Sequence, residues 1–298
     1  FVPFYGAIGP HPAATLSTAF SHVRKTPRNW KALELPQIDE FGRDNLRTNN
    51  ALRNARLKPL RIGAVAHPVV EMTDCWDDYM GSRNMSGRMD FIQSEKVIEH
   101  CGPISFHRWR PEGGIVGATD RRWDLFHVFE GIRRDTKGRG RRDDRELDVM
   151  KDAHSAAVDA GVVEFCSLTV SGHPAACAYN YRTEGRLENV FLGAREEYGD
   201  AALTCLLGHM LRDSFMRDDQ RIVFHPHDAQ QVRTWSNADL TSIAYGHYAK
   251  FSPVAQLLKR RRAAEACNFP VQRPSVKIEV AAEEQAAVPA NAPSLKAY

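Results

Sequence analysis

The sequence predicts a mixed α/β (α+β) fold with a central, mostly antiparallel sheet flanked by helices. Three strand-like segments between residues 162 and 194 are joined by short turns that contain glycine, as in an antiparallel meander. Helix-like segments precede this meander, and an apolar helix and a further strand follow it. With 298 residues, 43% hydrophobic and 26% charged, the chain can bury the core of one large domain or two small ones.

The first 75 residues carry about half the strands that such a fold needs. Their periodicity predicts a strand at 1–5, a helix at 12–25, a strand at 30–38, a helix at 43–56, and a strand or strand pair at 60–72. Because the chain starts at Phe1 within a strand-like segment, we expect a fragment whose natural N-terminus is missing. No run of about 18 apolar residues predicts a membrane span, and no signal-peptide pattern opens the chain.

The remaining residues alternate between helical and strand-like patterns. They predict a long amphipathic helix from Trp76 to His100, a strand at 103–111, helices at 124–132 and 144–160, strands at 162–170, 174–182 and 186–194, a helix at 200–215, and a strand at 221–225. Gly161 is expected to end the helix at 144–160. From Cys267 onward, Ala, Pro, Glu and Gln without periodicity predict a disordered tail.

Charge and cysteine content narrow the class of protein. A net charge of +3 gives no case for a nucleic-acid partner or an acidic membrane surface. Residues 133–145 are strongly basic, but interleaved aspartates and the lack of an aromatic residue favour a solvated loop over a phosphate site. The six cysteines form no CxxC pair, and several of them lie in apolar strand or helix patterns, which indicates buried free thiols in a reducing cytoplasm.

The order of these elements resembles the core of the GNAT acyltransferases. The segments "SRNMSGRMDFIQSEKVIEHCG" and "AAVDAGVVEFCSLTVSGHPAACAYNYRTEGRLENVFLGAREEY" are similar to its double-lobed branch, which includes the Fem-type transferases and the acetyltransferases of cellulose biosynthesis. The resemblance spans roughly residues 30–262 and is strongest over 150–250. It implies a partial N-terminal GNAT-like lobe at 1–75, a C-terminal acyltransferase lobe with its bridging helix at 76–262, and a disordered tail at 263–298.

The resemblance also implies a reaction and a cofactor. The chain is expected to transfer an acyl group from acetyl-CoA, or another acyl-CoA, to an amine or sugar acceptor, as an N-acetyltransferase does. In GNAT-like folds the pantetheine arm pairs with a splayed strand, and the pyrophosphate meets the N-terminus of the next helix. Here the implied cofactor-binding residues belong to the joint between strand and helix: Arg195, Tyr198, Gly199, Asp200 and Ala201.

This joint departs from the phosphate loop of the family. The family pattern is R/Q-x-x-G-x-G/A, whereas "REEYGDAA" places its glycine one position later from Arg195. Asp200 suits a helix N-cap, but its charge repels phosphate. The joint is therefore open to a second interpretation, in which it is only a capped helix start.

Catalytic candidates come from the central strands of the meander. Glu188 is expected opposite Tyr179 and Tyr181, with the glutamate as base and a tyrosine as acid. The alternative is that the tyrosines pack in the core and that Glu188 pairs with Arg186 or with Arg182.

The segment after the last predicted strand supplies the remaining candidates. Arg233 and Trp235 stand where the double-lobed relatives carry a basic and an aromatic residue, so they are candidates for substrate binding, with packing at the lobe interface as the alternative. "FHPHD" offers His225, His227 and Asp228 as metal ligands, but no further ligand lies nearby at helical spacing, so we expect no metal.

Two other functions stay open beside the enzyme. One is an aminoacyl-tRNA-dependent transferase of the Fem kind, although no heptad-like insertion predicts its usual helical hairpin. The other is a non-catalytic GNAT-like factor in exopolysaccharide assembly, which the altered phosphate loop favours. The expected partner is a small molecule or a polysaccharide precursor, and the expected location is the cytoplasm.

Overall fold

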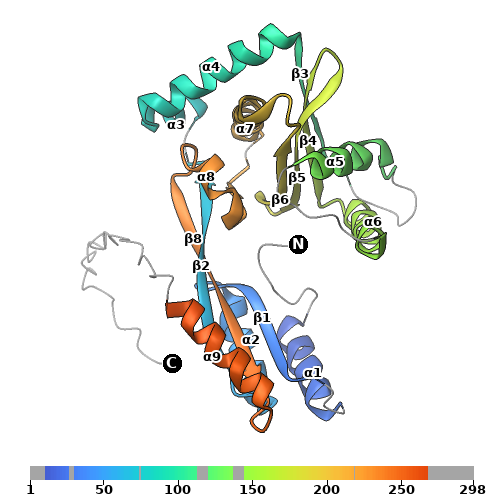
Figure 1. Ribbon diagram of the computed structural model, residues 1–298, viewed down its shortest axis with the longest axis vertical. Helices are drawn as coiled ribbons and strands as arrows, with labels where there is room; N and C mark the ends of the chain where they lie inside the picture. Colours follow the sequence, from blue (N-terminus) through green and yellow to red (C-terminus); the bar gives the residue numbers. More distant parts are fainter. Residues whose placement is uncertain are drawn as a thin grey trace, which may run out of the picture.

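A computed structural model describes residues 11–26, 30–73, 75–112, 120–136, 144–217 and 219–267. Within them, eight strands form one sheet in the order β1-β8-β2-β7-β6-β5-β4-β3. Figure 1 shows the long strands β2 and β8 side by side between β1 and the strands β3–β6. Every neighbouring pair is antiparallel except β6 and β7, which are parallel. The predicted mixed α/β class with a mostly antiparallel sheet is therefore confirmed. The strand expected at 1–5 and the tail expected after Cys267 lie outside the described residues.

Most of the predicted helices and strands lie close to their predicted positions. The helices are α1 (Pro12–Lys25), α2 (Arg43–Asn54), α3 (Trp76–Ser82), α4 (Met85–Cys101), α5 (Trp123–Asp135), α6 (Asp144–Asp159), α7 (Gly199–Met216), α8 (Ala229–Val232) and α9 (Pro253–Cys267), with a 3-10 turn η1 (Pro226–Asp228). The strands are β1 (Ala32–Asp39), β2 (Leu60–Glu71), β3 (Ile104–Trp109), β4 (Val163–Val170), β5 (His173–Thr183), β6 (Arg186–Ala194), β7 (Arg221–Val223) and β8 (Ala238–Tyr248).

The predicted meander is formed by β4, β5 and β6. Its first turn, Ser171–Gly172, has φ angles of 51° and 80°, and its second, Glu184–Gly185, has 51° and 77°. Two consecutive residues with positive φ define the tight hairpin turn that matches the twist of the strands. Glycine at the second position of each turn tolerates this backbone, so the local sequence sets the pairing of the residues next to each turn.

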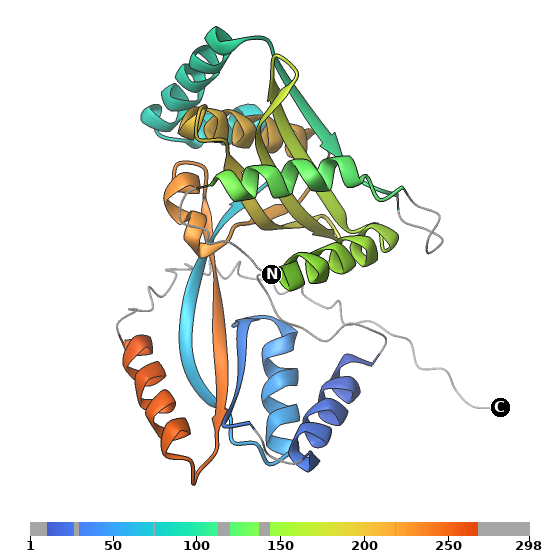
Figure 2. The same ribbon diagram turned by 45° about the vertical axis from the view of Figure 1, so that its right-hand side comes forward.

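Helices cover both faces of the sheet formed by β3–β6. Helices α4 and α7 lie on one face and α5 and α6 on the other, as Figures 1 and 2 show. Alternate residues of β5 therefore enter different cores: Ala176 and Ala178 pack toward α7, and Cys177 and Tyr179 pack toward α5 and α6. Lower in the same views, α1, α2 and α9 pack around β1, β2 and β8.

The long helix predicted from Trp76 to His100 is wrong, because the chain forms two helices there. Arg83 and Asn84 have extended backbones, with ψ angles of 150° and 153°. The Asn84 side chain accepts a hydrogen bond of 2.7 Å from the N–H of Gly87. Asparagine at this position satisfies a donor in the first turn of α4 and so starts a new helix.

Strand β8 and helix α9 were not predicted from the sequence. Strand β8 pairs with β1 on one edge and with β2 on the other, and so joins the N-terminal strands into the sheet. Helix α9 continues to Cys267, five residues into the segment 263–298 that was expected to be a tail. The description of 1–75 as a partial lobe stays a prediction. The two described strands of this segment, β1 and β2, do not pair with each other, because β8 lies between them in the sheet.

A buried histidine joins β2 to β8. His67 is fully buried, and its Nε2 lies 2.8 Å from the hydroxyl oxygen of Ser242. Burial lowers the pKa of His67 from its ordinary 6.5 to about 4, and the nearby His225 and Arg186 add to this effect. His67 is therefore neutral in the folded protein well below the pH at which it gains a proton in the unfolded chain.

Acid is expected to destabilise the protein through His67. Above pH 6.5, His67 is neutral in both the folded and the unfolded state. Between pH 6.5 and about 4 only the unfolded state binds the proton. The free energy of unfolding therefore falls as the pH is lowered through this window, by roughly 3 kcal/mol in total. Urea unfolding of the parent and of His67→Gln between pH 7 and 4 measures this contribution. The variant should lose clearly less stability than the parent, and two parallel pH curves would contradict the assignment.

Candidate functional site

The parallel strands β6 and β7 diverge after a short contact. They pair only where Arg186–Glu188 face Arg221–Val223, and the rest of β6 pairs with β5 alone. A cavity of about 1040 Å³ opens beside the unpaired edge. It is lined by Gln37, Asp135, Thr136, Val190, Leu192, Gly193, Ala194, Arg195, Glu196, Gly199, Asp200, Leu203, His225, His227, Asp228 and Gln231.

A bulge in β6 lies where the strands part. The pairing of β5 with β6 shifts between Asn189 and Phe191, which leaves Val190 as the extra residue. The buried side chain of Asn189 donates to the carbonyl of Phe191 at 2.9 Å and to the side-chain oxygen of Asn180 at 2.7 Å. Asn180 in turn donates to Glu164 at 2.8 Å. These bonds hold the bulge from the face opposite α5.

The N-terminus of α7 borders the cavity. Gly199 has a φ of +55°, and a Cβ built there would meet no atom within 4 Å, so its backbone is open to a ligand. The N-cap position is Tyr198, which makes no side-chain capping bond, and Asp200 lies in the first turn. The expected capping role of Asp200 is therefore wrong; its carboxylate is nevertheless close to the helix N-terminus, where the helix dipole favours negative charge.

Arg195 already has partners on the protein. Its Nε donates to the carbonyl of Pro174 at 2.8 Å, and its guanidinium pairs with Asp135 of α5 at 3.0 Å. Its backbone N–H donates to Ala175 and its carbonyl accepts from Gly199. Arg195 thus fixes the joint between β6 and α7, and its side chain is 37% exposed, so part of the guanidinium is open to a ligand.

The five residues expected to bind the cofactor separate into two groups. Arg195, Gly199 and Asp200 line the cavity. Tyr198 and Ala201 do not; they pack against the core between α7 and the sheet. Only the first three are placed to contact a ligand in this cavity.

The predicted catalytic residues lie away from the cavity lining. Glu188 pairs with Arg186 at 3.0 Å, and burial raises its pKa. The hydroxyl of Tyr179 lies 2.8 Å from Nδ1 of His154, and Tyr181 packs beside it in the core under α5 and α6. This is the geometry of the packing alternative, and a catalytic role for these residues stays a prediction.

The two residues expected to bind substrate are also outside the lining. Trp235 is buried, with its ring 5.7 Å from that of Phe91 in an edge-to-face contact. Its carbonyl accepts a hydrogen bond from the hydroxyl of Tyr79. Arg233 is exposed. The position of Trp235 is that of a packing residue, which was the alternative interpretation.

Two histidines after β7 line the cavity, and sequence reasoning considered them only as metal ligands. The rings of His225 and His227 stack with centroids 4.8 Å apart at an angle of 26°. Their position was signalled by "FHPHD" directly after a strand, because polar residues at a strand end meet whatever binds there. Imidazole is the side chain most suited to proton transfer near neutral pH.

The cavity lining is rich in carboxylates. Acidic groups come from Asp135, Glu196, Asp200 and Asp228. Among the described lining residues, the guanidinium group comes from Arg195. Such a lining attracts cations and opposes a diphosphate. This excess was not visible in the sequence, since the four acidic residues come from three separate segments.

A mostly antiparallel sheet whose parallel strand pair diverges at a helix N-terminus is the GNAT-type acyltransferase fold. Residues 86–230 match the family described as "Acetyltransferase (GNAT) domain". No curated protein sequence matches this chain significantly. Among the described residues, no helix has the length and apolarity needed to cross a bilayer.

This chain is similar to solved structures in differing degrees. FemX superposes with a TM-score of 0.55 at 10% sequence identity, covering 84% of this chain and 79% of that one. L-PGS from Bacillus licheniformis gives a TM-score of 0.46 at 10% identity over 77% and 72% of the two chains. A tandem GNAT protein from the clavulanic acid biosynthesis pathway gives 0.42 at 14% identity over 80% and 70%.

The domain match supports the GNAT superfamily, whereas the likeness to FemX concerns the fold alone. The expected kinship with the acetyltransferases of cellulose biosynthesis stays a prediction.

Proposed function

We propose that the protein transfers an acyl group from an acyl-CoA to an amine within the cavity between β6 and β7. The observation that carries this proposal is the divergence of the two strands at the N-terminus of α7. It leaves an unpaired strand edge, helix N–H groups and proton-accepting side chains around one cavity.

The donor fits the edge of β6. An extended chain with amide groups, such as pantetheine, can lie as an added strand along the edge of β6 that β7 does not cover. The N–H of Gly199 is taken by the carbonyl of Arg195, so among the lining residues the N–H of Asp200 is the first-turn donor for an anion. The exposed part of Arg195 supplies positive charge there.

The acceptor site favours an amine over a sugar hydroxyl. An ammonium group is attracted by the carboxylates of the lining, whereas a neutral sugar gains nothing from their charge. His225 lies two residues after Val223, the last paired residue of β7, and lines the cavity, so we assign it the removal of a proton from the attacking amine. Glu188 is the second candidate for this role.

Arg195→Ala is expected to weaken acyl-CoA binding by about 1.5 kcal/mol, the low end for a charge-assisted contact, because Asp135 already shares the guanidinium. Titration calorimetry with acetyl-CoA and with free CoA measures this loss. Arg217→Ala is the matched control, since Arg217 is an ion-paired arginine beyond the opposite end of α7. The control should bind like the parent.

Two outcomes would count against the proposal. Equal affinity of the parent and Arg195→Ala would remove Arg195 from the site. Undetectable binding of acyl-CoA and CoA to the parent would reject the donor altogether.

A second candidate is a Fem-type transferase that uses aminoacyl-tRNA. Two observations support this alternative. The fold is similar to that of FemX, and the negative charges of Glu196 and Asp200 weaken a diphosphate site at α7. Transfer from aminoacyl-tRNA without CoA binding would select this alternative. Absence of transfer from either donor would select the non-catalytic assembly factor.

A further inference from the structure

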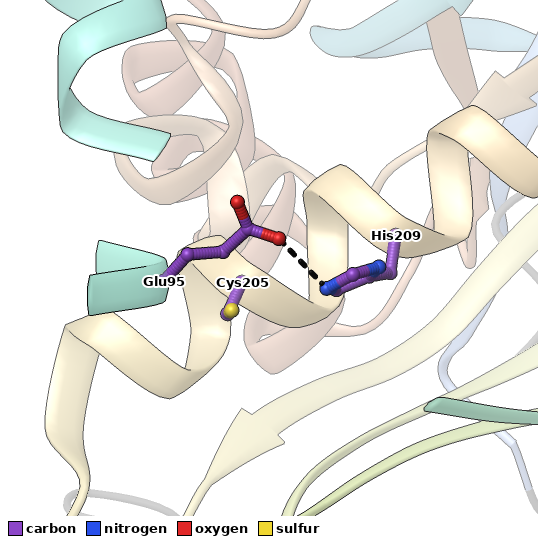
Figure 3. Close-up of side chains that lie close together, drawn as sticks. All are labelled: Glu95, Cys205 and His209. Atoms are coloured by element: carbon purple, nitrogen blue, oxygen red, sulfur yellow. Dashed lines mark ion pairs between the residues drawn. The ribbon is translucent and has the colours of Figure 1, made fainter. Parts of the chain in front are cut away.

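Three side chains with metal-ligating atoms meet between α4 and α7, away from the cavity. Glu95 comes from α4, and Cys205 and His209 come from successive turns of α7, as Figure 3 shows. The thiol sulfur, a ring nitrogen and a carboxylate oxygen all lie within 4.8 Å of one another. Nε2 of His209 is 3.1 Å from Oε1 of Glu95.

The spacing on the two helices explains why these groups converge. Residues four apart on a helix lie on the same face, so Cys205 and His209 both point toward α4. Gly208 lets the helices approach closely, because a Cβ there would lie 2.1 Å from the ring of Phe91. The close contact brings Glu95 of α4 to the pair on α7.

Packing holds the histidine ring in place. Phe106 of β3 stacks on His209 with centroids 5.8 Å apart at 19°, and Phe91 contacts it edge-on at 6.1 Å. Nε2 is buried but makes no well-angled hydrogen bond, although it is within ion-pair distance of Glu95. The ring is therefore oriented with a nitrogen that its protein neighbours do not fully satisfy.

We propose that Glu95, Cys205 and His209 bind a divalent cation that prefers mixed sulfur, nitrogen and oxygen ligands, with Zn²⁺ as the best match. Zinc accepts thiolate, imidazole and carboxylate ligands in tetrahedral geometry. Bond lengths of about 2.0–2.3 Å place the ligand atoms of a tetrahedral site about 3.3–3.8 Å apart. Side-chain rotations that move the ligand atoms by about 1 Å therefore complete the site. The exposed parts of Glu95 and His209 give an ion access and leave the fourth position to water.

Metal binding at this site has a chemical requirement and a structural consequence. The Cys205 thiol loses its proton to the solvent on coordination, which the cation makes favourable although burial and the nearby Glu95 and Glu99 raise the pKa of the free thiol to about 12. The bound ion would pin α4 to α7, the helix whose N-terminus borders the cavity.

Cobalt(II) is the probe for this site, because its d–d bands report tetrahedral coordination and its charge-transfer band in the near ultraviolet reports a thiolate ligand. Titration of the metal-free parent is expected to give both bands, saturating at one ion per chain. Zinc should abolish them by displacement and should raise the melting temperature.

Variants decide whether the three residues are the ligands. Cys205→Ser should remove the charge-transfer band, and His209→Ala and Glu95→Gln should each weaken cobalt binding at least tenfold. Cys101→Ser is the matched control, because Cys101 is an exposed thiol on α4, and it should leave the spectrum unchanged. Melting without metal verifies that each variant is folded.

The opposite pattern would overturn the proposal. Absence of both bands in the parent, or a charge-transfer band that survives Cys205→Ser and disappears in Cys101→Ser, would show that the cluster is not a metal site. None of these outcomes depends on acyl transfer, so the test is independent of the proposed function.

Discussion

Arg108→Met is expected to lower the free energy of unfolding by about 3–5 kcal/mol, since it leaves buried carboxylates without their main partner. Arg108 of β3 is 2% exposed and contacts Glu164 at 2.7 Å, Asp213 at 2.9 Å and Asp219 at 3.1 Å. Glu164 is fully buried, so its charge has no access to water. Arg110 also contacts Glu164 and Asp219, but one arginine cannot make the contacts of two.

Urea unfolding of the parent and the variant measures this loss. Arg47→Ala is the control, because Arg47 forms an ion pair with Asp44 at 3.1 Å on the partly exposed surface of α2, where such pairs contribute about 0–1 kcal/mol. The loss in Arg108→Lys should lie between the losses in Arg108→Met and Arg47→Ala, because lysine keeps the charge but not the forked geometry. A loss below about 1 kcal/mol in Arg108→Met would contradict this account of the network.

The network also bears on the cavity. Glu164 accepts a hydrogen bond from Asn180, and Asn180 accepts one from Asn189 at the bulge of β6. A variant that removes the contact of Arg108 with Glu164 is therefore expected to disturb the strand edge that lines the cavity, in addition to lowering stability.

His225→Gln is expected to lower acyl-transfer turnover by about 1000-fold while leaving donor affinity nearly unchanged, because a general base acts on the transition state rather than on binding. His225 lines the cavity where β6 and β7 part. Glu188→Gln is the comparison that separates the two candidate bases. Since Glu188 is ion-paired with Arg186 outside the lining, its replacement should affect the melting temperature and turnover together.

Steady-state kinetics with acetyl-CoA and an amine panel, together with thermal melting, tests both variants. A 100-fold or larger loss in Glu188→Gln at unchanged melting temperature, with His225→Gln active, would transfer the role of base to Glu188. Loss of donor binding in His225→Gln would indicate a binding residue instead of a base.

The local sequence by itself determined most of the secondary structure and the meander. Alternating apolar residues and two-residue turns ending in glycine specify β4, β5 and β6 without help from distant parts of the chain. The same holds for α1, whose predicted bounds match those observed. The break before α4 was also encoded locally, by the capping residue Asn84, but the continuous amphipathic pattern obscured it.

Tertiary structure decided the contacts between segments distant in the sequence. β8 is recognisable only once it lies between β1 and β2, because its mixed polar and apolar residues become a strand by pairing on both edges. The cavity likewise brings Gln37, Asp135, Asp200 and His225 together from four elements or loops. Periodicity reports which residues are buried within one element, whereas pairing partners depend on loop closure and packing over the whole chain. For that reason the sequence located the joint at Arg195 and Gly199, and only the fold revealed the acidic lining around it and the metal-ligating cluster between α4 and α7.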